Sequence, residues 1–280
     1  MVNFKYLKTF NSKCTMDEID DVSHKMIMKT VQASAFQKLI EGLKDVITDT
    51  NITFDDTGMR IMCMDGTHVS LVNLRLYADN FEKYKCDSEI VVGVNMNNFF
   101  RLVKSIENND VLTLSLEKNN DHYLKIHIEN NDKHKSTKYQ LKLLDLDQQN
   151  ISVPASDFKT VITLPSSDFQ RICRDMLNIG QSIEIRNLGD RITLSCNGDF
   201  ATQATEIRGL SNENTTIIPD DHKISGNFSL KNLVLFTKCT NLCSTVELYL
   251  KNDYPLLIKY QVASLGRLFF CLAPKSTDID

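Results

Sequence analysis

The sequence predicts an α+β protein made of two similar halves, and two observations lead to this fold class. Amphipathic helical stretches begin near Phe36, Phe99, Phe169 and Leu230, at intervals of about 60 to 70 residues. The segments between them alternate apolar and polar residues, which is typical of antiparallel strands with one buried face. Because such a sheet must bury its apolar side, we expect antiparallel sheets that cover the helices on one face.

The helical stretches are predicted from the spacing of their apolar residues. Phe36, Leu39, Ile40 and Leu43 follow the i, i+3, i+4, i+7 pattern of a helix with one buried side. The second and third stretches repeat this spacing, and the fourth is less regular. Each stretch is preceded by a residue whose side chain can accept the free amide hydrogens of a first helical turn, namely Ser34, Asn98, Ser167 and Ser229.

An alternating strand follows each helical stretch after a polar turn. These four strands are expected at 52–54, 111–116, 183–185 and 246–250. Further strands are expected at 60–63, 69–76, 123–128, 191–196, 204–207 and 256–262. The repeats pair into two domains. We expect an N-terminal extension at 1–24, a first domain at 25–142, an acidic linker at 143–159, and a second domain with a short acidic tail at 160–280.

The composition excludes several classes of protein. With 280 residues, of which 42% are hydrophobic and 24% charged, the chain can bury full cores and is not expected to be disordered. Its longest apolar runs are far shorter than the roughly 18 to 20 residues that a membrane span needs, and no secretory signal opens it. Eight cysteines without a Cys-x-x-Cys pair indicate neither a zinc site nor a disulfide framework. We therefore expect a soluble intracellular protein with no metal, no cofactor and no membrane partner.

Each helical stretch also carries cations on the side away from its apolar stripe, although the net charge of the chain is −4. One basic face is typical of an ordinary solvated helix, but four similar faces in one chain make that interpretation less convincing. Gln37 and Glu41 interrupt the first face. The cations concerned are Lys38, Lys44, Arg101, Lys104, Arg171, Arg174, Lys231 and Lys238.

Several motifs resemble those of one known family. They lie, in order, at 64–71 (MDGTHVSL), 142–147 (KLLDLD), 169–175 (FQRICRD), 236–238 (FTK), and 254–255 (YP) through 272–275 (LAPK). The chain is similar over about residues 25–275 to the eukaryotic-type proliferating cell nuclear antigen, the DNA sliding clamp. This resemblance implies a homotrimeric ring in which each protomer has two clamp domains, the helices line a central hole, and the sheets form the outer shell.

The resemblance also implies a function. A clamp of this family encircles duplex DNA without reading its sequence, and it performs no chemistry. It is a processivity factor in DNA replication and repair that tethers DNA polymerase and, through the same groove, a clamp loader, flap nuclease and DNA ligase that carry PIP-box peptides. The eight cations would face DNA phosphates. The expected location is the nucleus, or a viral replication compartment if the source is a large DNA virus.

Two further sites follow from the resemblance. Ring closure would pair the edge strands 135–142 and 204–210 of neighbouring protomers, with Tyr139, Leu141, Leu143, Ala204 and Ile207 at the interface. Cys271 and Ser229 depart from the family pattern in the groove, where an aromatic and a small apolar residue are usual. The wall of the PIP-box groove would be formed by Met64, His68, Val69, Leu71, Ile151, Val153, Pro154, Phe158, Pro255, Ala273 and Pro274.

Two alternatives remain open at this point. A checkpoint-type clamp subunit has the same fold but assembles with two different partners, and it would stay monomeric alone. A hydrolase would use Cys63 or His68 as nucleophile or base beside Asp65, but no oxyanion-hole motif accompanies this trio.

Overall fold

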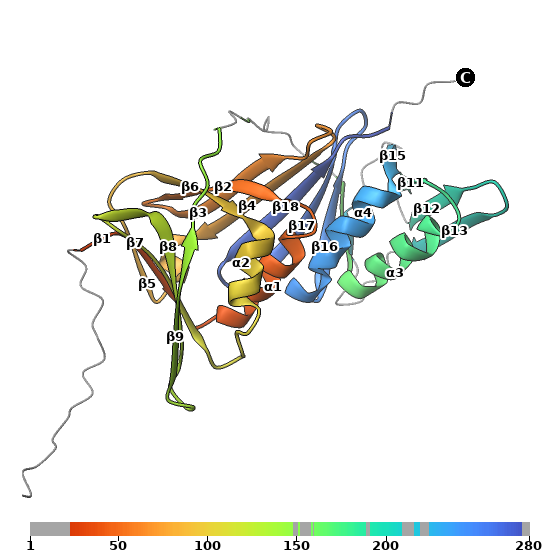
Figure 1. Cartoon of the computed structure of the whole chain (residues 1–280). Helices are drawn as coiled ribbons and strands as arrows, with labels where there is room; N and C mark the ends of the chain where they lie inside the picture. The colour runs from red at the N-terminus through yellow and green to blue at the C-terminus, as the bar shows by residue number, and fades with distance from the viewer. Residues whose placement is uncertain are drawn as a thin grey trace, which may run out of the picture.

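The computed structural model describes residues 23–147, 151, 158, 160–188, 191–208, 216–218 and 224–275. Two successive sets of elements make up this part of the chain, and Figure 1 shows their helices side by side along one side of the sheets. All pairings between the described strands are antiparallel. None of the helices in these ranges is long and apolar enough to span a lipid bilayer.

The first set contains two helices. Each helix is preceded by a strand and followed by at least three strands. In chain order, the elements are β1 (His24–Thr30), α1 (Ala33–Leu43), β2 (Asp49–Asp55), β3 (Gly58–Met64), β4 (Ser70–Tyr77), the 3-10 turn η1 (Ala78–Asn80), β5 (Lys83–Cys86), β6 (Ile90–Asn95), α2 (Met96–Val103), β7 (Val111–Glu117), β8 (Asn120–Asn130) and β9 (Lys135–Lys142).

The second set repeats this order of strands and helices. Its elements are β10 (Thr160–Pro165), α3 (Ser166–Leu177), β11 (Ser182–Asn187), β12 (Arg191–Asn197), β13 (Thr202–Arg208), β14 (Thr216–Ile218), β15 (Ile224–Ser229), α4 (Leu230–Phe236), the 3-10 turn η2 (Thr237–Leu242), β16 (Thr245–Leu250), β17 (Leu256–Val262) and β18 (Gly266–Leu272).

Strand pairing is duplicated as well as element order. The first half forms the orders β5-β1-β7-β8-β9 and β4-β3-β2-β6, and the second half forms the matching orders β14-β10-β16-β17-β18 and β13-β12-β11-β15. Thus β18 corresponds to β9, and β13 corresponds to β4. Within the chain, β18 pairs with β4 from Gly266↔Leu76 to Leu272↔Ser70 and fuses strands of both halves into one nine-stranded sheet. Their counterparts β9 and β13 each end a sheet.

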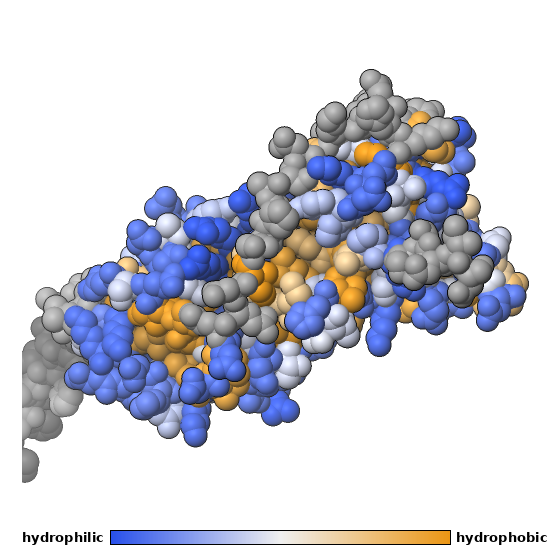
Figure 2. All heavy atoms as spheres, turned by 90° about the horizontal axis from the view of Figure 1, so that it is seen from above, coloured by the Kyte–Doolittle hydropathy of each residue, from blue (hydrophilic) through white to orange (hydrophobic). Residues whose placement is uncertain are grey.

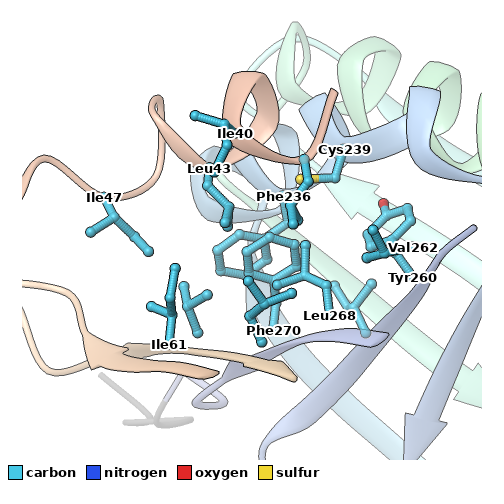
Figure 3. Packing of buried hydrophobic residues seen from close by; sticks show 14 of the residues in the cluster. Ile40, Leu43, Ile47, Ile61, Phe236, Cys239, Tyr260, Val262, Leu268 and Phe270 are labelled. Atoms are coloured by element: carbon cyan, nitrogen blue, oxygen red, sulfur yellow. The ribbon is translucent and has the colours of Figure 1, made fainter. Parts of the chain in front are cut away.

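Both halves contribute to one cluster of buried apolar side chains between the helices and the sheets. In Figure 3, Ile40 and Leu43 of α1 and Phe236 of α4 point toward the sheet residues Ile61 and Phe270. The rings of Phe236 and Phe270 stack with centroids 4.4 Å apart. Because α1 and Ile61 belong to the first half while Phe236 and Phe270 belong to the second, the apolar core crosses the boundary between the halves.

Three of the four described helices begin at other residues than the capping pattern predicts. Asn95, not Asn98, caps α2, because the Asn95 side chain accepts a hydrogen bond from the Asn98 amide at 2.9 Å. Ser34 and Ser167 lie inside α1 and α3, whose N-cap residues make no side-chain cap hydrogen bond. Ser229 does occupy the N-cap position of α4, but its side chain makes no cap hydrogen bond either.

Candidate functional site

The four helices lie in a row, in the order α2, α1, α4 and α3 (Figure 1), which we call the helix row. Apolar residues such as Phe36, Phe99, Phe169 and Leu233 are fully buried against the sheets. The cations on the opposite helix sides therefore point away from the sheets. Seven of the eight predicted cations are exposed and Lys44 is half-buried.

The helix row is basic although the chain is acidic. The helices and the residues that follow them carry eight cations but only four carboxylates. These carboxylates are Glu41, Asp45, Asp168 and Asp175. Glu41 interrupts the basic face of α1 as the sequence indicates, and it accepts a long 3.5 Å hydrogen bond from Gln37. The positive charge of the row is the kind of sequence-independent field that attracts a polyanion.

Ion pairs divide the eight cations into two groups. Arg171 pairs with Asp168 one turn away at 3.0 Å, and both Lys44 and Lys238 pair with Asp45. Within the described part of the chain, no carboxylate forms an ion pair with the other five, which are Lys38, Arg101, Lys104, Arg174 and Lys231.

The predicted interface residues lie on the two strands that end their sheets. Leu141 of β9 is buried, Tyr139 is half-buried, and Leu143 follows the strand and donates its amide hydrogen to the His122 carbonyl at 3.0 Å. On β13, Ala204 is exposed and Ile207 is half-buried. Residues 209 and 210 of the predicted edge lie outside the described residues.

One apolar residue beside β13 was missed by the sequence pattern. Phe200 lies in the β12–β13 turn and is 78% exposed, more than any other large apolar residue among those described. A turn residue between two polar segments has no apolar neighbours at regular spacing, so the sequence pattern cannot identify it. Phe200 is recognised only from its exposure in the structure, next to a strand that ends its sheet. A single exposed ring is common on protein surfaces, but this one lies beside β13, which ends its sheet in the part of the chain that the structure describes.

Several predicted groove residues meet where β3 and β18 end and β4 begins. The amide of Ala273 donates to the carbonyl of Val69 at 2.9 Å, so these two segments lie side by side. Val69 is 38% exposed, whereas Leu71 beneath it is 8% exposed. Met64 and Ile151 line the same hollow of about 720 Å³, which also contains linker residues. Figure 2 shows apolar side chains among polar ones near the middle of this face.

The end of the linker is held by aromatic contacts. Phe158 packs edge-to-face against Tyr249 and Tyr254, with ring centroids 5.8 Å and 5.4 Å apart. Pro255 directly follows Tyr254 and is half-buried, and Pro274 and Tyr254 line a second hollow of about 1130 Å³. The predicted groove residues Val153 and Pro154 lie outside the described residues.

Cys271 lies beneath this face rather than at its surface. It is 9% exposed and paired in register with Leu71 of β4. Burial raises the pKa of its thiol to about 11. The residue therefore acts as a small apolar side chain in the floor of the sheet.

Among the described residues, no side-chain hydrogen bond joins Cys63, Asp65 and His68 to one another. Burial raises the pKa of the Cys63 thiol to about 11, so the thiol is not an activated nucleophile. Partial burial alone would raise the pKa of Asp65, but hydrogen bonds from Thr67 and from the amides of Val69 and Ser70 outweigh it and hold this pKa below its usual value. Asp65 thus closes a turn. His68 has a positive φ of 58°, and its Nδ1 lies 3.1 Å from the Met64 sulfur.

The fold and the surface define a protein with two similar domains. Its helices present a basic face, and the strands β9 and β13 end their sheets without a further partner strand among the described residues. Comparison with known sequences identifies its family. The family model for the proliferating cell nuclear antigen N-terminal domain matches residues 26–150, and that for the C-terminal domain matches residues 152–275. The chain therefore belongs to the proliferating cell nuclear antigen family, which confirms the resemblance drawn from the motifs.

Two relatives match nearly the whole chain. A protein of Paramecium bursaria Chlorella virus 1, named "Probable DNA polymerase sliding clamp 1", is 38% identical over 260 residues, which cover 91% of this chain and 99% of the relative. The "Proliferating cell nuclear antigen" of Chaetomium thermophilum is 35% identical over 251 residues, which cover 88% of this chain and 96% of the relative.

Proposed function

We propose that three copies of this chain close into a ring that encircles duplex DNA and serves as a sliding clamp for DNA polymerase. One observation carries the proposal: β9 and β13 are sheet ends, although their counterparts β18 and β4 are joined within the chain. Pairing β9 of one copy with β13 of the next would repeat that junction and remove both edges. Membership of the proliferating cell nuclear antigen family supports three copies as the number that closes the ring.

Hydrogen-bond direction supports this pairing on the β13 side. The Gly198 amide donates to the Ala201 carbonyl at 3.0 Å, and Gly198 and Ala201 therefore form a hydrogen-bonded pair at the end of the β12–β13 ladder. Such pairs alternate along an antiparallel ladder, so Gln203 and Thr205 bond to β12 while Ala204 directs its N–H and C=O outward.

The backbone groups of β9 alternate in the same way. Leu143 donates to His122, so Leu141 and Tyr139 bond to β8, and Lys138 directs its backbone groups outward. When the two halves are aligned on their ladders, Lys138 corresponds to Phe269 and Ala204 to Asn73. Phe269 and Asn73 are partners in the internal junction. The two free edges thus offer backbone groups at corresponding positions.

In the ring, the helix row would face the central hole and the eight cations would contact DNA phosphates. Contacts of this kind carry no sequence information, so the ring could move along the duplex. Retention on DNA would be topological, and a negative outer shell would not weaken it. The ring would perform no chemistry, in keeping with the raised pKa of the Cys63 thiol.

Replication and repair proteins would dock on the face of the linker. The exposed Val69, the hollow shared by Met64 and Ile151, and the nearby Pro255 support a groove that accepts the aromatic anchors of a PIP-box peptide. DNA polymerase, a clamp loader, flap nuclease and DNA ligase are the proposed partners. The protein would act in the nucleus, or in a viral replication compartment if the source is a large DNA virus.

A topological assay tests the proposal directly. The protein is loaded on a nicked circular duplex with a clamp loader, and the complex is isolated and then linearised with a restriction enzyme. A clamp remains on the circle at high salt and is lost when the circle is cut, because a ring slides off free ends. Equal retention on circular and linear DNA, or a particle that is monomeric at micromolar concentration, would contradict the ring.

A further inference from the structure

One carboxylate in the helix row binds a lysine from each half of the chain. Asp45 lies two residues after the end of α1, and its Oδ1 accepts a hydrogen bond from Lys44 Nζ at 3.1 Å. Its Oδ2 accepts one from Lys238 Nζ of η2 at 2.8 Å, across 193 positions of sequence. Partial burial would raise the pKa of Asp45, but the bonds from both lysines outweigh it and lower this pKa.

The ion pair lies where the two halves pack together, a place that we call the seam. Gly42 of α1 lies against Cys239 of η2, and a Cβ on Gly42 would come within 2.5 Å of the Cys239 sulfur. The three charged side chains are partly shielded, with 21% of Lys44, 30% of Asp45 and 43% of Lys238 exposed. The Lys44 ammonium also lies 5.0 Å from the centre of the Phe100 ring. Both lysines are therefore already engaged before any ligand arrives.

The second half of the chain shows the same backbone without this carboxylate. After α1, the amides of Val46 and Ile47 both donate to the Leu43 carbonyl, and after α3, the amides of Ile179 and Gly180 both donate to the Met176 carbonyl. This pattern aligns Asp45 with Asn178. The backbone at this position thus accommodates Asn as well as Asp, and the charge of Asp45 is not required by the helix end.

We propose that Asp45 competes with DNA phosphate for Lys44 and Lys238 at the seam. By holding both lysines, it lowers the affinity of the clamp for the duplex. This inference rests on the proposed function. A phosphate that approaches the seam must displace the carboxylate or share its lysines, and the three side chains together offer one positive charge instead of two. Weak, exchangeable contacts favour movement along DNA over a fixed register.

The test compares Asp45→Asn with a matched control, Asp121→Asn. Asp121 also pairs with a lysine at 3.1 Å, that of Lys25, but it lies on β8, away from the helix row. Both substitutions remove one negative charge from the protein. Binding to a short fluorescent duplex is measured by anisotropy at several salt concentrations, and particle mass and thermal unfolding confirm that each variant remains assembled.

We expect Asp45→Asn to bind the duplex more tightly and with a steeper salt dependence. The slope of log K against log salt should steepen by about 0.9 for each phosphate gained, which makes the advantage over wild type about threefold larger at 50 mM than at 200 mM salt. The control should follow the wild type. In a Lys44→Gln, Lys238→Gln background, Asp45→Asn should have no effect, because the cations that it frees are gone.

A second comparison keeps the proposal testable if Asp45→Asn is unstable. Lys238→Gln should reduce the salt slope less than Lys231→Gln, because Lys231 on α4 has no ion pair among the described residues whereas Lys238 is engaged. Equal losses, or equal binding by Asp45→Asn and wild type, would overturn the proposal. A wild type that shows no salt-dependent duplex binding would instead refute the proposed contacts between the helix row and DNA phosphates, and this inference with them, while retention on circular DNA separately tests the ring.

Discussion

Ring assembly can be tested at a single backbone amide, that of Ala204. Its N–H points away from β12, toward the place where β9 of the next copy would pair. Proline at this position removes the N–H, and a strand edge tolerates proline where the amide faces away from its own sheet. We therefore expect Ala204→Pro to fold as a monomer and to fail to form the ring.

The magnitude follows from the number of junctions. At each junction the lost N–H leaves the carbonyl of Lys138 on the next copy without a donor, which costs about 1 to 3 kcal/mol. A closed trimer contains three junctions, so dissociation into monomers would become easier by about 3 to 9 kcal/mol in total. Since about 1.4 kcal/mol corresponds to a factor of ten, even the lower value raises the dissociation constant more than a hundredfold.

Light scattering after size exclusion measures the outcome. The wild type should have the mass of three chains of 31.9 kDa each, about 96 kDa, and Ala204→Pro should shift toward one chain at low micromolar concentration. Ala204→Val keeps the amide and should remain a trimer. Thr205→Pro removes an amide that bonds to β12 and should instead lower the unfolding temperature. An Ala204→Pro protein that stays trimeric over the same dilution range would refute the proposed pairing.

Three further predictions address DNA, partners and pH. Arg171→Ala with Arg174→Ala should reduce polymerase stimulation and flatten the salt dependence of duplex binding by up to about 0.9 per lost phosphate contact, at unchanged ring mass; an unchanged slope would remove these residues from the DNA surface. A PIP-box peptide should bind with micromolar-order affinity, about 8 kcal/mol, and Ile151→Ala with Pro255→Ala should weaken it at least tenfold in calorimetry while the trimer persists; no heat with the wild type would eliminate the groove. Asp65→Asn should lose about 1 to 3 kcal/mol of stability at pH 7, because its hydrogen bonds favour the ionised form. Since the folded pKa of Asp65 lies below the ordinary value of 3.8, this contribution is present at neutral pH and is lost as the pH falls through that range, so wild type and variant should converge in acid-unfolding curves; a constant difference would contradict the assignment.

Local patterns predicted the helices and many of the strands. The i, i+3, i+4, i+7 spacing identifies the buried side of α1, since Phe36, Leu39, Ile40 and Leu43 are all fully buried. Alternation similarly identifies β12 and β17. It gives no clear signal for β1, where Met26, Ile27 and Met28 are all fully buried, because a strand covered on both faces loses its period of two.

Long-range features of the candidate site could not be predicted from local patterns. Asp45 reads as an ordinary charge at a helix end, because its partner Lys238 lies 193 positions away in sequence. The exposed Phe200 has no periodic neighbours, and its position at a free edge becomes visible only when β13 is seen to end a sheet. The cap of α2 was misplaced by three residues because Asn95 and Asn98 are both capable caps, and only the backbone geometry distinguishes them.

The fused β18–β4 junction would also determine where the proposed ring opens. A closed trimer would contain six joints of one strand-pairing design, three inside chains and three between them. The internal junction is stabilised by further contacts. Gln32 and Ser264 exchange hydrogen bonds across it, and Gly42 lies against Cys239. The polypeptide chain also connects its two sides through the linker. Each protomer would therefore move as a stiff arc, and a gate wide enough to admit DNA would form between chains, where no continuous polypeptide crosses the joint.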